Sequence, residues 1–123
     1  MLSVENLVVS YDGIEALKSI RLEVPEGSIV TLIGANGAGK SSTLRAIIGL
    51  VKPKSGRILY KGKDIAGMRS QDIVRLGISL VPEGRRVFPN LTVLENLRIG
   101  AYLRTDKPGI DKDLEWVTSL FPR

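Results

Sequence analysis

The sequence predicts an α/β fold: a core with a partial parallel sheet and helices, an N-terminal antiparallel β subdomain, and the start of a helical subdomain. Three observations support this prediction. Apolar and polar residues alternate near the N-terminus, an apolar run at 29–33 leads into a glycine-rich loop, and helix-spaced apolar residues follow. With 43% hydrophobic and 25% charged residues, the 123-residue chain has the composition of one globular domain.

Two stretches near the N-terminus have the pattern of antiparallel strands. Apolar and polar residues alternate over 2–11 and over 20–28, as they do in strands that bury one face. Asp12 and Gly13 are suited to a turn between them, and a second turn is expected at 25–27. The run IVTLI at 29–33 is almost entirely β-branched or leucine, which is typical of a parallel strand covered on both faces.

A helix is predicted directly after the glycine loop. Gly49 and Pro53 are expected to bracket its end, because glycine favours the position after a helix and proline cannot continue one. The apolar residues at helical spacing are Leu44, Ile47, Ile48 and Val51.

The next segment alternates strand and helix signals. Residues 56–65 predict a strand followed by a turn at Gly62. Residues 70–77 predict a short helix with Ser70 as its cap, and 78–82 predict a second buried strand.

The C-terminal third predicts two helices. Thr92 and Glu95 have the spacing of a capping box, in which each side chain binds the other residue's backbone N–H. A turn is expected at 106–110 and a helix over 111–121. The apolar residues of the first helix are Leu94, Leu97 and Ala101, and the second is expected to bury Leu114, Val117 and Phe121.

The glycine loop matches the phosphate-binding pattern G-x-x-x-x-G-K-S/T (Walker A) through Gly34, Gly39, Lys40 and Ser41. Glycines let successive backbone N–H groups point at a phosphate, and the helix start adds the positive end of its dipole. Lys40 supplies a point charge for the outer phosphates, and the Ser41 hydroxyl suits Mg²⁺. A dinucleotide fingerprint would need glycine where Ser42 lies. The sequence therefore predicts a P-loop NTPase core that binds a nucleoside triphosphate with Mg²⁺.

Composition excludes several other functions. Cysteine and histidine are both absent, which excludes disulfides, zinc sites built on these residues and Cys or His nucleophiles. The net charge is +5, but the basic residues are scattered among acidic ones, so no nucleic-acid partner is predicted. The N-terminus does not have the pattern of a secretory signal, and no apolar run approaches the roughly 20 residues of a membrane span.

Over its whole length, the chain resembles the ATP-binding subunits of ABC transporters. The loop and helix GANGAGKSSTLRAIIGL and the segment PKSGRILYKGKDI are similar to that family, and the guanine-reading N-K-x-D of GTPases is absent. The stretch LVPEGRRVFPNLTVLENLRIGAYL looks like the branched-chain amino acid subgroup of the LivF type.

The resemblance implies roles for residues outside the loop. Tyr11 lies where the family keeps an aromatic residue that stacks on adenine. Glu83 lies where most members keep a glutamine that touches the metal and the attacking water, so we expect Glu83 and Lys40 to be catalytic, although the charge of Glu83 differs from glutamine. Arg85 and Arg86 are either a solvated pair or part of an interface with the permease or its regulators. The expected nucleotide contacts are Tyr11, Gly34, Ala35, Asn36, Gly37, Ala38, Gly39, Lys40, Ser41 and Ser42, and the expected metal contacts are Ser41 and Glu83.

The resemblance also implies the surroundings of the protein. ATP and Mg²⁺ are the expected ligands, and membrane permease subunits and a second ATP-binding subunit, identical or different, are the expected partners. The expected location is cytoplasmic, peripheral on the inner face of the cell membrane.

Some of the family's parts are absent from this sequence. It contains no LSGGQ-like signature, no apolar strand ending in Asp and followed by a catalytic Glu, and no switch histidine. We therefore interpret 1–123 as a partial nucleotide-binding domain, with a P-loop core and antiparallel β subdomain at 1–91 and the start of a helical subdomain at 92–123. A fragment or a self-associating remnant is expected, because a half-built sheet exposes unpaired edges.

Three functions remain open from the sequence. The first is a transport ATPase subunit that powers amino-acid import, of which this segment alone binds Mg-ATP without efficient turnover. The second is a nucleotide-binding module that does not hydrolyse ATP. The third is a P-loop ATPase linked to nucleic acid, although relatives of that kind usually carry long insertions and none is found here.

Overall fold

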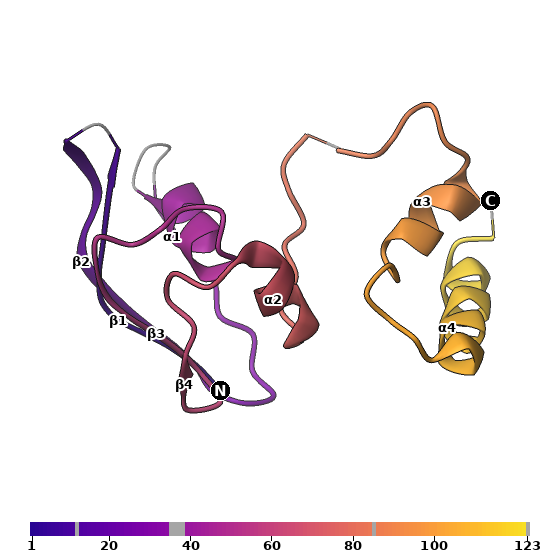
Figure 1. Ribbon diagram of the computed structural model, residues 1–123, viewed down its shortest axis with the longest axis horizontal. Coiled ribbons are helices and arrows are strands. Elements are labelled where there is room, and N and C mark those ends of the chain that lie inside the picture. The colour runs from indigo at the N-terminus through magenta and orange to yellow at the C-terminus, as the bar shows by residue number, and fades with distance from the viewer. Residues whose placement is uncertain (12, 35–38, 85, 123) are drawn as a thin grey trace. The chain divides into compact units, whose positions relative to one another are not determined.

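The computed structural model describes residues 1–11, 13–34, 39–84 and 86–122, which belong to two compact units, 1–80 and 81–123. Each unit is described by itself (Figure 1). The first contains β1 (Leu2–Tyr11), β2 (Ile14–Val24), α1 (Lys40–Ile47), β3 (Ser55–Tyr60), β4 (Lys63–Asp64) and α2 (Ser70–Arg75). The second contains α3 (Val93–Ile99) and α4 (Lys107–Leu120).

The first unit is built on a four-stranded antiparallel sheet with the order β2-β1-β3-β4. Val4 of β1 pairs with Leu22 on one side and with Ile58 on the other. The predicted antiparallel pair is confirmed, although β2 begins earlier than expected, at Ile14. The turn predicted at Gly62 joins β3 to β4.

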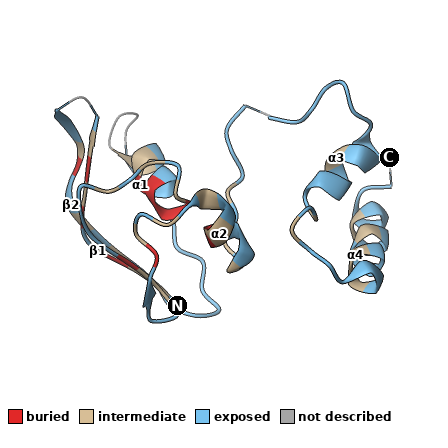
Figure 2. Ribbon diagram, viewed as in Figure 1, coloured by how far each residue is buried: buried red, intermediate tan, exposed pale blue. Residues whose placement is uncertain are grey.

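Helices α1 and α2 contribute to one apolar core with the sheet. Figure 2 shows the buried positions of β1 and α1 in red. Because strands that bury one face alternate apolar and polar residues, the pattern along β1 provides three residues of this core. Its members are Val4, Leu7, Val9, Leu17, Ala46, Ile47, Ile48, Ile58, Ile65 and Ile73.

Helix α1 ends at Ile47, and Gly49 follows its C-cap residue Ile48, as predicted for a glycine just past the end of a helix. Gly49 has φ +85°, a left-handed conformation that glycine adopts without strain. Its N–H donates to the Ala46 carbonyl at 3.3 Å, and the Leu50 N–H donates to the Arg45 carbonyl at 2.9 Å. These two bonds form a Schellman motif, which satisfies carbonyls at the end of the helix.

The predicted cap of α2 is wrong by one residue. Ser70 is the first residue of the helix, and the extended residue before it is Arg69. The Arg69 Nε donates to the Asp72 carboxylate at 3.0 Å, so an ion pair rather than a hydroxyl supports the first turn.

The two predicted parallel strands are also wrong. Residues 29–33 and 78–82 are assigned to no strand, and Ile29 and Ile33 expose 96% and 93% of their surface. A parallel strand is formed only when neighbouring strands take up its backbone hydrogen bonds, and all the strand pairs of the described residues are antiparallel. The apolar composition of these runs therefore shows that the residues are suited to a buried strand, but it does not show that a partner strand is present.

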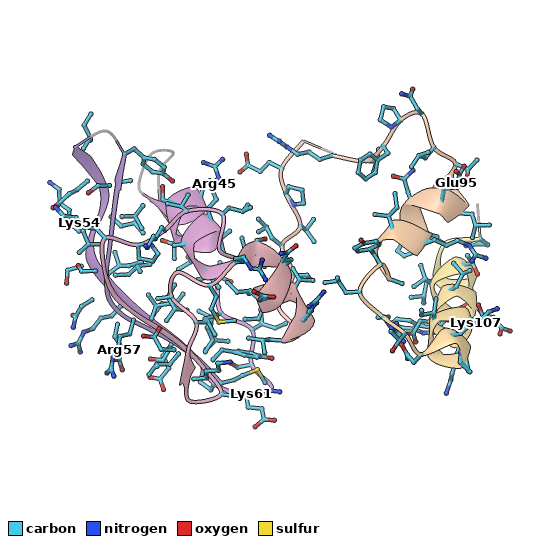
Figure 3. All side chains as sticks on the ribbon, in the orientation of Figure 1. Arg45, Lys54, Arg57, Lys61, Glu95 and Lys107 are labelled. Carbon is cyan, nitrogen blue, oxygen red and sulfur yellow. The ribbon has the colours of Figure 1, made fainter. Side chains whose placement is uncertain are left out.

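The second unit begins its first helix with the predicted capping box. The Glu95 N–H donates to Thr92 Oγ1 at 3.1 Å, and the Thr92 N–H donates to Glu95 Oε1 at 3.1 Å. Figure 3 labels Glu95 on α3. The bond from the Thr92 backbone N–H to the charged carboxylate, with a smaller contribution from the Thr92 hydroxyl, holds the pKa of Glu95 below its ordinary value.

Helix α4 begins earlier than expected, and the turn predicted at 106–110 is wrong. Asp106 is the residue before the helix, and Pro108 lies in the first turn, where its missing N–H costs no hydrogen bond. The predicted burial is only partly right, since Leu114 and Val117 are half-buried and Phe121 is 72% exposed. Among the described residues, no helix has both the length and the hydropathy needed to cross a bilayer.

Candidate nucleotide-binding site

The glycine loop runs into α1, and the structure describes both of its ends. Lys40 is the first residue of α1, and its Nζ donates to the Gly34 carbonyl at 2.5 Å. This bond brings the lysine ammonium back to the residue at which the loop begins. The predicted contacts Ala35, Asn36, Gly37 and Ala38 lie outside the described residues.

The N-terminus of α1 has the features of an anion site. The residue before the helix is Gly39, which has φ +91° and no side chain to accept a hydrogen bond from the first amides. The first turn contains no acidic residue, and Ser41 and Ser42 follow Lys40 within it. Backbone N–H groups at a helix start, the helix dipole and an ammonium therefore coincide, and all three favour phosphate.

Thr43 fixes the Gly39 carbonyl, a role that sequence reasoning missed. Its N–H and its Oγ1 both donate to that carbonyl, at 2.9 and 2.8 Å. Thr43 is only 3% exposed and is the buried polar residue of this core. A hydroxyl four residues after the last glycine of the loop is the signal that could have indicated it.

Gly39 also lies against β2. A Cβ atom placed on Gly39 would be 2.3 Å from Leu17 Cδ2 and 3.1 Å from the Ala16 carbonyl oxygen. A residue with a side chain would fit there only if the Leu17 side chain or β2 shifted. The loop therefore needs glycine at 39 for space as well as for conformation.

Tyr11 lies at the same end of the β1–β2 hairpin as this contact. It is the last residue of β1, pairs with Ile14 and is 39% exposed. Leu17, which contacts Gly39, pairs with Val9, two residues before Tyr11. The structure thus brings an accessible aromatic ring and the end of the phosphate loop to one end of the hairpin. Stacking of Tyr11 on a base stays a prediction.

The described residues offer few ligands for a divalent cation. They contain no group of three or more His, Cys, Asp or Glu side chains that could hold a metal ion. Mg²⁺ commonly takes its ligands from substrate phosphates and water with one or two protein oxygens, so the Ser41 hydroxyl beside a triphosphate fits that need.

The remaining predicted site residues belong to the second unit. Glu83 is exposed, and its backbone carbonyl accepts a hydrogen bond from Arg86 Nε at 3.2 Å. Arg85 lies outside the described residues. A metal-binding or catalytic role for Glu83 stays a prediction.

Sequence comparisons find relatives along the whole chain. Residues 17–121 match the family model described as "ABC transporter". The chain is 47% identical over 123 residues to the high-affinity branched-chain amino acid transport ATP-binding protein BraG of Pseudomonas aeruginosa, covering 100% of this chain and 52% of the relative. It is 34% identical over 122 residues to a probable branched-chain amino acid transport ATP-binding protein, LivF, of Archaeoglobus fulgidus, covering 99% and 51%. The chain spans about half the length of these two relatives.

Solved structures of ABC transporter cassettes also resemble this chain. An ATP-binding cassette of an ABC transporter in its ADP conformation is 30% identical, with a TM-score of 0.72 over 100% of this chain and 45% of that chain. A dimeric bacterial ABC transporter cassette is 25% identical, with a TM-score of 0.78 over 94% of this chain and 55% of that chain. These similarities confirm the predicted class of fold.

Proposed function

The chain belongs to the ABC transporter family, and on that premise we propose that it forms the phosphate-binding part of an ATP-binding subunit that powers the import of branched-chain amino acids through a membrane permease. The observation that carries the proposal is the 47% identity to such a transport protein, which extends over all 123 residues. Because the match is not confined to the glycine loop, it supports this subgroup more strongly than P-loop proteins in general.

The nucleotide would be held by groups at the start of α1. Lys40 would exchange the Gly34 carbonyl for phosphate oxygens, and the first amides of the helix would donate to the same group. Tyr11 would stack on the base, since it is accessible at the end of the hairpin against which Gly39 packs. When bound, Mg²⁺ would neutralise charge on the phosphates, with Ser41 as its contact in this unit.

We propose that these 123 residues bind Mg-ATP without efficient turnover. Catalysis of phosphoryl transfer depends on positioning and on charge stabilisation around the attacking water. The sequence contains no histidine and no LSGGQ-like segment, and Glu83 is the acidic candidate for contact with the water. Binding by this segment and hydrolysis by the subunit are therefore separate proposals.

The proposed partners follow from the same relatives. A solved cassette of similar fold is dimeric, which supports a second ATP-binding subunit as partner. The relatives' names describe transport, so permease subunits are the other proposed partner, with the chain peripheral on the inner face of the membrane. We propose no nucleic-acid partner.

Calorimetric titration with Mg-ATP, followed by a phosphate-release assay on the same sample, tests this function. Loss of one charge-assisted contact costs about 1.5–3 kcal/mol, so Lys40→Ala should weaken binding by roughly 10- to 100-fold. Lys112→Ala is the matched control, because it removes the same charge from an exposed position on α4. Absence of binding by the unmodified chain would overturn the proposal, and phosphate release that depends on Lys40 would overturn the absence of turnover.

A further inference from the structure

We propose that Leu17 is a positioning residue for the phosphate loop: its side chain on β2 holds Gly39, and with Gly39 the first turn of α1. The inference rests on the proposed nucleotide-binding function and adds a residue outside the glycine pattern that does not itself touch the nucleotide. According to this proposal, the β1–β2 hairpin contributes to phosphate binding by holding the loop in place.

The contact between the two residues is tight and buried. Leu17 is 3% exposed, and its Cδ2 would be 2.3 Å from a Cβ atom placed on Gly39. Real side-chain carbons essentially never approach other heavy atoms within 3.0 Å, so Leu17 fills the space that a side chain at 39 would need. Leu17 is itself fixed by the pairing of the edge strand β2 with β1, in which Leu17 pairs with Val9.

Gly39 is held from its other side by α1. The Thr43 N–H and Oγ1 donate to its carbonyl at 2.9 and 2.8 Å. Gly39 therefore lies between β2 and α1, and Lys40 follows it directly. Truncating Leu17 leaves a cavity under Gly39 into which the loop can move, and groups that bind a ligand lose affinity when they are displaced.

The backbone conformation of Gly39 offers a simpler explanation for the glycine. A φ of +91° is strained for any residue with a side chain, whatever lies nearby. If conformation alone mattered, Gly39→Ala would have the same effect with or without Leu17→Ala. If the contact matters, Leu17→Ala makes room for the added methyl group, and the combined effect is smaller than the sum.

The first test compares two leucine truncations in Mg-ATP calorimetry, each on samples that circular dichroism shows to be folded. Leu7→Ala is the matched control, because Leu7 is fully buried in the same core and pairs with Ile20 rather than contacting the loop. We expect Leu17→Ala to raise the Kd about tenfold and Leu7→Ala to change it less than about twofold. Equal changes in Kd would overturn the inference. If either alanine variant is unfolded, Leu17→Met and Leu7→Met replace the pair, since methionine keeps the volume and lacks the branched methyl. We then expect Leu17→Met to raise the Kd more than Leu7→Met does. Equal changes in Kd would again overturn the inference.

The second test needs no nucleotide. Thermal unfolding is measured for Gly39→Ala, for Leu17→Ala and for the two combined. We expect Gly39→Ala to lower the Tm less when Leu17→Ala is present, because the shorter side chain makes room for the added methyl group, and additive shifts would overturn the inference. Should the unmodified chain fail to bind Mg-ATP, the proposed function fails while this measurement still decides the role of Leu17.

Discussion

Asn96 on α3 provides a test of how the segment before that helix is held. Its Oδ1 accepts from the Phe88 N–H at 2.9 Å, and its Nδ2 donates to the carbonyls of Phe88 at 3.1 Å and Thr92 at 2.8 Å. A fourth contact, to the Leu91 carbonyl, is 3.4 Å long. One side chain amide, with both of its donor hydrogens engaged, therefore fixes the backbone from 88 to 92 against the helix.

Asn96→Ala removes these bonds together. A hydrogen bond contributes about 0.5–1.5 kcal/mol net, and the lower value applies here because water can replace the amide at exposed positions. Three well-formed bonds then stabilise the segment by about 1.5 kcal/mol, which corresponds to about a tenfold change in the equilibrium for opening.

Amide hydrogen exchange at Phe88 measures this equilibrium directly. We expect the protection of the Phe88 N–H to fall about tenfold in Asn96→Ala. Asn90→Ala, which removes an exposed amide from the same segment, should leave it unchanged. Equal protection of Phe88 in the unmodified chain and in Asn96→Ala would refute the reasoning.

Three further changes test other elements. Thr92→Ala removes the oxygen that accepts from the Glu95 N–H and should destabilise α3 by about 1 kcal/mol. The helical circular dichroism signal of the variant should therefore be weaker than that of the unmodified chain, and equal signals over a heating series would contradict this. Ile58→Ala, at a fully buried side chain, should lower the free energy of unfolding in urea by about 2–5 kcal/mol, and an unshifted midpoint contradicts it. Hydrogen bonds from Arg104 hold the pKa of Asp106 below its ordinary value of 3.8, so the pair stabilises the fold above about pH 4 and this contribution is lost as the pH falls through the lowered pKa. Asp106→Asn should therefore flatten the acid limb of thermal stability, and an equally steep limb would contradict the assignment.

The elements that sequence alone predicted well are those determined by near neighbours. The capping box needs only Thr92 and Glu95, three residues apart, and Gly49 ends α1 through bonds to residues of the preceding turn. Alternation along β1 also sufficed to predict a half-buried antiparallel strand. Each of these signals lies within a few residues of the structure it predicts.

The errors concern features that depend on residues far apart. The run at 29–33 has the composition of a buried strand, but composition does not specify which strand takes up its hydrogen bonds. The contact of Leu17 with Gly39 joins β2 to the phosphate loop across the turn at 25–27, and no local pattern indicates it. For the candidate site, the sequence indicated the residues at the start of α1, but not the side chains that pack beneath them.

The pairing of β1 with both β2 and β3 has a consequence for folding during synthesis. Val4 pairs with Leu22, which follows soon after it, and with Ile58, which is synthesised much later. A ribosome adds about 5–20 residues per second, whereas a hairpin forms within about 1–10 μs. On the nascent chain, β1 therefore has one edge without a partner strand for on the order of seconds, until β3 emerges and pairs with it.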